Sequence, residues 1–136
     1  MRSLAGLLCG ASLALGLSAC GNTVATSSFK GEEHEAAQVV ANLVTYATAS
    51  EQSKVCADVL SAKIVSQLGG KSGCEEAIKS QLAEIDNLEV TVQSVKIAPG
   101  GTTATAAVRS IYGGKTRAGT VTLAKEGGKW RLSALP

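Results

Sequence analysis

The chain has 136 residues, of which 45% are hydrophobic, 18% charged and 3% aromatic, and its net charge is +2. This length suits one domain and excludes most large two-domain enzymes. A nucleic-acid partner is usually met by a clustered basic face or by aromatic side chains that stack on bases. The near balance of charge and the scarcity of aromatic residues therefore argue against nucleic acid.

The first twenty residues are typical of a secretory signal. Arg2 supplies one positive charge, and residues 4–17 then run without a charge. Such a short run favours a signal peptide over a membrane span, which needs about 20 apolar residues. It ends with Leu17, Ser18, Ala19 and Cys20. This ending resembles the bacterial lipobox, in which small residues precede a cysteine that accepts the lipid.

The lipobox resemblance predicts cleavage after residue 19 and a lipid on Cys20. The protein would then be anchored in the cell envelope, on the outer face of the cytoplasmic membrane or on the outer membrane. The alternative is an ordinary signal peptide beside an incidental Cys20. Residues 20–31 are small and polar, which predicts a lipidated flexible tether, and residues 32–136 form the predicted single domain.

Two further cysteines, Cys56 and Cys74, remain in the mature chain. In an oxidising compartment an even number of remaining cysteines predicts a disulfide. For a loop of this size, the bond would stabilise the fold by about 3 kcal/mol. The alternatives are two buried free thiols, or redox or metal chemistry. The spacing is not that of a C-x-x-C motif and the chain has one histidine, so we expect neither a metal nor a cofactor.

Helical periodicity follows the tether. Residues 32–49 carry an apolar stripe at helical spacing, with acidic residues in the first turn. Ser50 is a candidate cap for the next segment, where residues 55–60 form an apolar helical face. Ser61 is expected to begin a short helix that ends at the glycines 69–70.

A further helix and four strands complete the pattern. Ser72 and Glu75 form a capping box that predicts a helix to about residue 85. Alternation then predicts strands over residues 88–97, 102–112, 115–125 and 129–135, with a bulge near Ser94 and glycine-rich turns between them. The fold class expected is α+β, with the N-terminal helices packed on one face of a four-stranded curved antiparallel sheet.

This organisation resembles the nuclear transport factor 2-like superfamily, whose members form a cone of helices half-wrapped by a sheet. The resemblance rests on the helix over residues 33–49, on residues 55–60 and 73–77, and on the ending 119–132 with its Lys129, Trp130 and Arg131. A cystatin-like sheet is the nearest structural rival. The superfamily implies a cavity between sheet and helices, and it includes isomerases and dehydratases as well as members without chemistry.

The sequence contains no convergent catalytic set. Asp58 is the residue best placed for a cavity mouth, and Tyr112 and Trp130 are expected on the apolar side of the sheet, so these three form the candidate pocket. Each also has a purely structural interpretation as a solvated helix residue or as core. Asp86 is assigned to a turn, and His34 to a frayed helix start where a catalytic base would be wet and unpaired.

Basic residues gather in the last three strands. Arg109, Arg117, Lys129 and Arg131 are the candidate outer basic face, with Lys115 nearby. The structural alternative is an ordinary solvated face. The functional alternative is a surface for anionic lipid, wall polymer or an acidic protein patch.

Three functions remain. The leading hypothesis is a lipid-anchored envelope lipoprotein that is not an enzyme and serves as an interaction or small-ligand-binding module, with an envelope protein, wall polymer or small apolar ligand as partner. The second is a cavity enzyme or binder of a small apolar molecule, similar to an isomerase or dehydratase, that uses Asp58. The third is a structural lipoprotein of envelope assembly.

Overall fold

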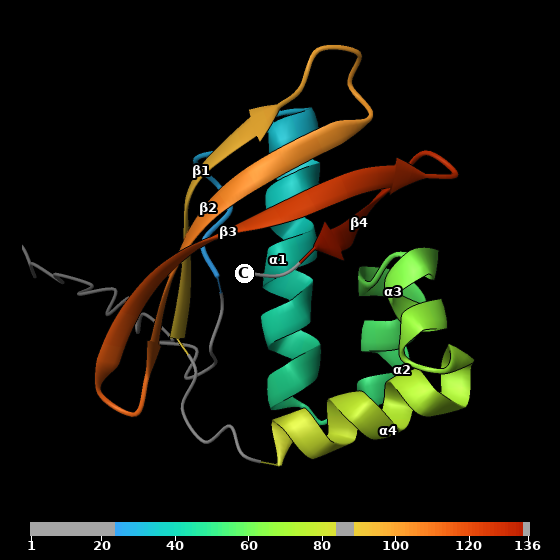
Figure 1. The fold of residues 1–136 in the computed structure, drawn as a ribbon. Coiled ribbons are helices and arrows are strands. Elements are labelled where there is room, and N and C mark those ends of the chain that lie inside the picture. Colours follow the sequence, from blue (N-terminus) through green and yellow to red (C-terminus); the bar gives the residue numbers. More distant parts are fainter. Residues whose placement is uncertain (1–23, 84–88, 135–136) are drawn as a thin grey trace, which may run out of the picture.

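The computed structural model describes residues 24–83 and 89–134 of the chain. The fold is α+β, as the sequence predicts, and its helices cover one face of a curved antiparallel sheet (Figure 1). The elements are α1 (Glu32–Thr48), α2 (Gln52–Lys54), the π-helical turn η1 (Val55–Val59), α3 (Ala62–Gln67), α4 (Gly70–Leu82), β1 (Glu89–Ile97), β2 (Thr103–Tyr112), β3 (Lys115–Glu126) and β4 (Lys129–Ala134). Cys20 and Asp86 lie outside the described residues. Within those residues, no helix is long and apolar enough to cross a membrane.

The sheet is a meander in which each strand pairs with the next, in the order β1-β2-β3-β4. The register between β1 and β2 shifts between Val92 and Ser94, which confirms the predicted bulge. A second shift, between Thr122 and Leu123 where β3 pairs with β4, is not signalled by the alternation of the sequence. Bulges increase the local twist of a strand, so both help the sheet to curve over α1.

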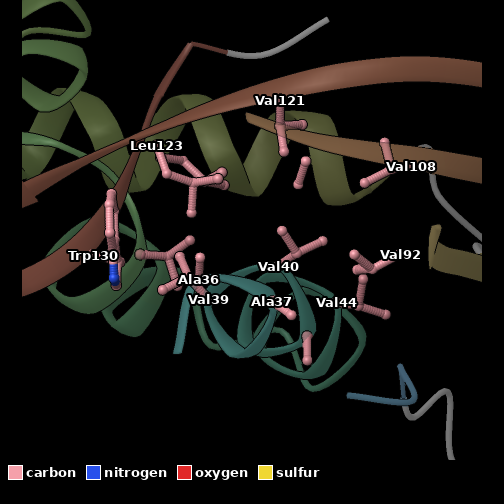
Figure 2. Close-up of a cluster of buried hydrophobic side chains, with 14 of the residues drawn as sticks. Ala36, Ala37, Val39, Val40, Val44, Val92, Val108, Val121, Leu123 and Trp130 are labelled. Carbon is pink, nitrogen blue, oxygen red and sulfur yellow. The ribbon is translucent and has the colours of Figure 1, made fainter. Parts of the chain in front are cut away.

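The core lies between α1 and the concave face of the sheet (Figure 2). Ala36, Val40 and Val44 form a buried stripe on α1 that faces Val121 and Leu123 of β3. Alanine and valine are short, so the helix packs close to the strands. Side chains of the core therefore occupy the space between α1 and the middle of the sheet.

The end of α1 differs from the expected cap. Ser50 adopts a left-handed conformation with φ 57° and its amide donates to the carbonyl oxygen of Ala47. It therefore closes α1 from the C-terminal side, and the residue that precedes α2 is Glu51. A residue in the left-handed conformation turns the chain sharply at the end of a helix, and glycine usually occupies this position.

The turn between α3 and α4 is tighter than the capping box predicts. Ser61 begins α3 as expected, its hydroxyl accepting a hydrogen bond from the amide of Ile64. Gly69 ends the turn with φ 98°, and α4 starts directly at Gly70, so Ser72 lies inside the first turn instead of capping it. The left-handed glycine redirects the chain before Ser72 is reached, which explains the earlier start.

The predicted tether is shorter than residues 20–31. Val24 is 9% exposed and belongs to the core, and Phe29 packs against that core. His34 Nδ1 donates to the carbonyl oxygen of Thr26 at 3.0 Å, and the Thr26 hydroxyl donates to Gln38 Oε1 at 3.2 Å. Residues 24–31 therefore belong to the domain. Val24 and Phe29 are the apolar residues of this otherwise small and polar stretch, and they hold it against the core.

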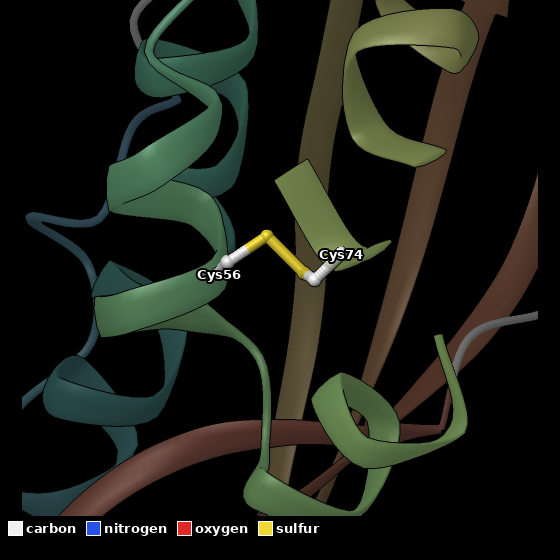
Figure 3. The surroundings of a disulfide bond; sticks show 2 residues. All are labelled: Cys56 and Cys74. Atoms are coloured by element: carbon white, nitrogen blue, oxygen red, sulfur yellow. A yellow bond between two sulfur atoms is a disulfide. The ribbon is translucent and has the colours of Figure 1, made fainter. Parts of the chain in front are cut away.

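A disulfide joins Cys56 of η1 to Cys74 of α4, with an S–S distance of 2.03 Å (Figure 3). Both residues are buried, at 6% and 0% exposure. The pairing is the one that the cysteine count predicts. It ties α4 to the π-helical turn, so the short helices form one unit beside α1.

Candidate functional site

A surface groove of about 480 Å³ runs between α1, η1 and β4. Its lining combines one polar edge of α1 with the π-helical turn and the start of β4, and consists of Glu35, Val39, Asn42, Tyr46, Asp58, Gly128, Lys129, Trp130 and Arg131. The four residues from α1 recur every three or four positions, so they lie on one side of the helix. The buried stripe of α1 is visible in the apolar pattern of the sequence, whereas this adjoining stripe is marked only by its equally regular spacing.

Two of the three candidate pocket residues meet in this groove. Asp58 lies on η1, where its side chain is exposed, and Trp130 enters from β4. Tyr112 does not belong to the groove and is 46% exposed at the end of β2. Its position in the alternation is on the core side, shared with buried Ala106 and Val108, but β2 extends past the part of the sheet that the core covers.

The indole of Trp130 is held from α1. Its Nε1 donates to Glu32 Oε2 at 2.7 Å, and Lys125 Nζ donates to Glu32 Oε1 at 2.7 Å. The Lys125 ammonium also lies 5.4 Å from the centroid of the Trp130 ring. The hydrogen bond from Lys125, followed by that from Trp130, lowers the pKa of Glu32 below its ordinary value of 4.5. These contacts fix the Trp130 ring, which is 3% exposed and lines the groove.

Arg131 connects the groove to the short helices. Its guanidinium donates to the backbone carbonyl oxygen of Ala57 in η1. The same side chain borders a second depression of about 450 Å³, lined also by Cys56, Leu60 and Glu126. Arg131 therefore lies between two hollows.

The register divides the predicted outer basic face. Arg109 pairs with Ala118, whereas Arg117 pairs with Ser110. Opposite residues share a face and neighbours alternate, so Arg109 and Arg117 leave opposite faces of the sheet. Arg131 pairs with Ala124, about 20 Å along β3 from Ala118. Arg109, Lys129 and Arg131 share the outward parity, as predicted, and Arg117 is the exception, because counting alternation within one strand does not fix its face across a turn.

The groove carries charge of both signs. Glu35 and Asp58 supply carboxylates, and Lys129 and Arg131 supply cations. Within residues 24–83 and 89–134, no cluster of His, Cys, Asp or Glu side chains is grouped as a metal site would require. The arrangement offers ionic and hydrogen-bonding contacts beside the hydrophobic surfaces of Val39 and Tyr46.

Comparison with known proteins gives structural neighbours but no relatives. No known protein family matches the chain, and no curated protein is similar to it. A de novo designed protein with a curved β-sheet is 21% identical over 46% of this chain and 58% of its own length, with a TM-score of 0.37. A protein named Rd1NTF2_05 that carries five substitutions is 14% identical over 71% of this chain and 92% of its own, with a TM-score of 0.46. The de novo designed NTF2 fold protein NT-9 is 16% identical over 71% and 80%, also at 0.46.

Proposed function

We propose that this chain is an exported, lipid-anchored domain of the bacterial cell envelope that binds a polar partner in the groove between α1 and β4. Two features support export and anchoring. The lipobox-like residues end in Cys20, and the disulfide between Cys56 and Cys74 belongs to an oxidising compartment. The nuclear transport factor 2-like cone remains the superfamily that we propose for the domain, from the order of its helices and strands.

The composition of the groove carries the proposal of binding. Two carboxylates and two cations line, together with Trp130, a hollow that is open to solvent. Mixed charge favours a partner that carries both signs, such as a segment of an envelope protein, over a small apolar molecule. The middle of the core is occupied by side chains of α1 and β3, so the groove is the better candidate for a ligand than the space beneath the sheet.

The anchor is tested by the mass of the exported protein. We expect the mature chain to begin at Cys20 and to carry the mass of its acyl groups, and the Cys20→Ala variant to leave the membrane fraction. A mature chain of unmodified mass would contradict the proposed anchor.

The groove is tested by photo-crosslinking in cells. A crosslinking residue at Asn42, inside the groove, is expected to capture a partner, whereas the same residue at the exposed Lys79 of α4 is the matched control. Capture through Asn42 should fall when the charge of Lys129 is reversed by Lys129→Glu. Equal capture from both positions, or capture that is insensitive to Lys129→Glu, would contradict a binding role for the groove.

A second candidate function is a cavity enzyme that uses Asp58 as a general base. It is favoured by one observation, which is that Asp58 and Trp130 line the same groove. A general base must be held within reach of the proton that it removes, and Asp58 is exposed on a short helical turn, so we rank this function second. Asp58→Asn would abolish turnover of an isomerase or dehydratase substrate if this function were correct, and would leave crosslinking through Asn42 unchanged.

A further inference from the structure

The tip of the β2–β3 hairpin displays hydrophobic side chains. Ile111 and Tyr112 are 36% and 46% exposed, and they are two of the three large hydrophobic residues that are exposed in the described part of the chain. Gly113 and Gly114, both with positive φ, make the two-residue turn that follows them. Nearly all the side chains from residue 109 to residue 118 are exposed, so the tip extends beyond the core.

The same tip is cationic. Arg109, Lys115 and Arg117 are all exposed there, and Glu89, which pairs with Ile111, is the one acidic residue opposite them in β1. Between Glu89 and Glu126 the sequence contains five Lys and Arg residues and no Asp or Glu. The hairpin therefore has the charge that is attracted to an anionic surface.

The distribution over the two faces favours a bilayer over a protein partner. Arg109 and Ile111 leave one face of the hairpin, whereas Tyr112, Lys115 and Arg117 leave the other. A protein partner would cover one face and leave the other in water. The headgroup region of a bilayer surrounds an inserted tip, and it accepts a tyrosine and long cationic side chains on both faces.

The N-terminal segment places the anchor near this end of the domain. Thr26 contacts His34 and Gln38, so residues 24–31 run back along α1 toward its C-terminal half. Val44, Val92 and Val108 lie together at the end of the core toward which this segment runs (Figure 2). The tip of β2 continues from Val108 past that same end, by about 13 Å.

The length of the chain limits the distance to the membrane. Cys20 and Val24 are separated by three residues, which span at most about 14 Å between the two Cα atoms. A lipid on Cys20 would therefore hold Val24 within this distance of the bilayer surface. The hairpin tip, which protrudes from the same end, is then within reach of the headgroups.

We propose that the tip of the β2–β3 hairpin, residues 109–117, inserts into the headgroup region of an anionic bilayer and fixes the orientation of the domain on the membrane. This inference rests on the proposed attachment at Cys20. It deepens the proposed function, because a fixed orientation determines which direction the groove between α1 and β4 faces.

The test attaches the mature chain through its Cys20 thiol to a maleimide lipid in vesicles, so it does not depend on whether cells acylate that cysteine. The vesicles contain phosphatidylglycerol and phosphatidylcholine with brominated acyl chains, which quench nearby indoles. Tyr112→Trp reports on the tip, and Leu68→Trp, at the exposed end of α3, is the matched control. Trp130 is present in both proteins and cancels in the comparison.

We expect the indole at residue 112 to be quenched more strongly than the indole at residue 68. Adding Lys115→Glu and Arg117→Glu to the Tyr112→Trp protein should remove this excess quenching. Each basic residue near an anionic surface is expected to shift the docking equilibrium about fivefold. Equal quenching at both positions would overturn the inserted tip. An excess that is unchanged in pure phosphatidylcholine vesicles would overturn its recognition of anionic lipid. Neither of these results bears on the acylation of Cys20, which is tested independently by the mass of the exported protein.

Discussion

Glu32 and Trp130 lie 98 residues apart in the sequence and are joined by a hydrogen bond of 2.7 Å from the indole Nε1 to the carboxylate. Lys125 donates to the other oxygen of the same carboxylate. The first residue of α1 thereby fixes the ends of β3 and β4. The helix also gains from a negative charge in its first turn, so Glu32 serves both the helix and the sheet.

Removal of this carboxylate is expected to lower stability in a pH-dependent manner. Its hydrogen bonds hold the pKa of Glu32 below 4.5 in the folded protein. Its contribution is therefore present above pH 4.5 and is lost as the pH falls through the lowered pKa. The Tm difference between the wild-type protein and Glu32→Ala should be clear at about pH 7 and should shrink toward about pH 3. The control is Glu33→Ala, which removes a neighbouring exposed carboxylate. An identical pH profile for both variants would contradict a stabilising role for the hydrogen bonds from Trp130 and Lys125 to Glu32.

Loss of the disulfide is expected to cost about 3 kcal/mol, as a loop of this length predicts. Cys56 and Cys74 are separated by 18 positions, and both are buried. The measurement is urea denaturation of the double variant Cys56→Ala and Cys74→Ala beside the oxidised wild-type protein. Reduction of the wild-type protein should give a loss of similar size. A midpoint that does not move in either case would show that the helical half is held without the bond.

Gly73→Ala is expected to destabilise the protein, although alanine is the better helix former. A Cβ atom at Gly73 would lie 2.2 Å from the backbone oxygen of Leu68, so the turn between α3 and α4 must shift. Overpacking of this kind costs about 1–3 kcal/mol, more than the gain of about 1 kcal/mol from helix propensity. Ser72→Ala, at the adjacent exposed position, should be neutral or slightly stabilising. An increase in Tm for Gly73→Ala would show that the turn yields freely.

Ser50→Gly is expected to stabilise the protein by about 0.5–1 kcal/mol, because glycine adopts the left-handed conformation without the steric cost of a Cβ atom. Ser50 holds that conformation with φ 57°. Ser50→Ala keeps the Cβ atom and should bring no gain. Thermal denaturation of the two variants distinguishes the effect of the backbone conformation from loss of the hydroxyl. Equal Tm values for the two variants would argue against an effect of the backbone conformation.

The local elements follow from the sequence because their signals are local. The stripe on α1, the alternation of the strands and the glycine turns each depend on residues close together in the chain, and the bulge between Val92 and Ser94 is visible as a change of parity. Ser50 and Ser72 do not occupy their predicted capping positions, because serine suits several positions near a helix end and the neighbouring turn decides among them.

The candidate site depends on contacts between distant segments, which the sequence does not show. Asp58 and Trp130, two residues of the predicted pocket, line one groove, but the sequence does not show that the stripe from Glu35 to Tyr46 completes it. Tyr112 obeys the alternation of β2 and is nevertheless exposed, since the length of the core and not the parity of the strand decides burial. Arg117 cannot be separated from the other basic residues until the register places it on the opposite face of the sheet.

β4 follows every other helix and strand of the domain in the sequence, and this order determines when the fold can be completed. The bond between Cys56 and Cys74 lies within the helical half and needs none of the strands. By contrast, Trp130 meets Glu32, and Leu132 accepts a hydrogen bond from Ser61, only through the last strand. A chain synthesised from its N-terminus can therefore form this disulfide early, but its helices cannot dock on the edge of the sheet until β4 has been made. Premature termination before Lys129 would leave a crosslinked but open protein.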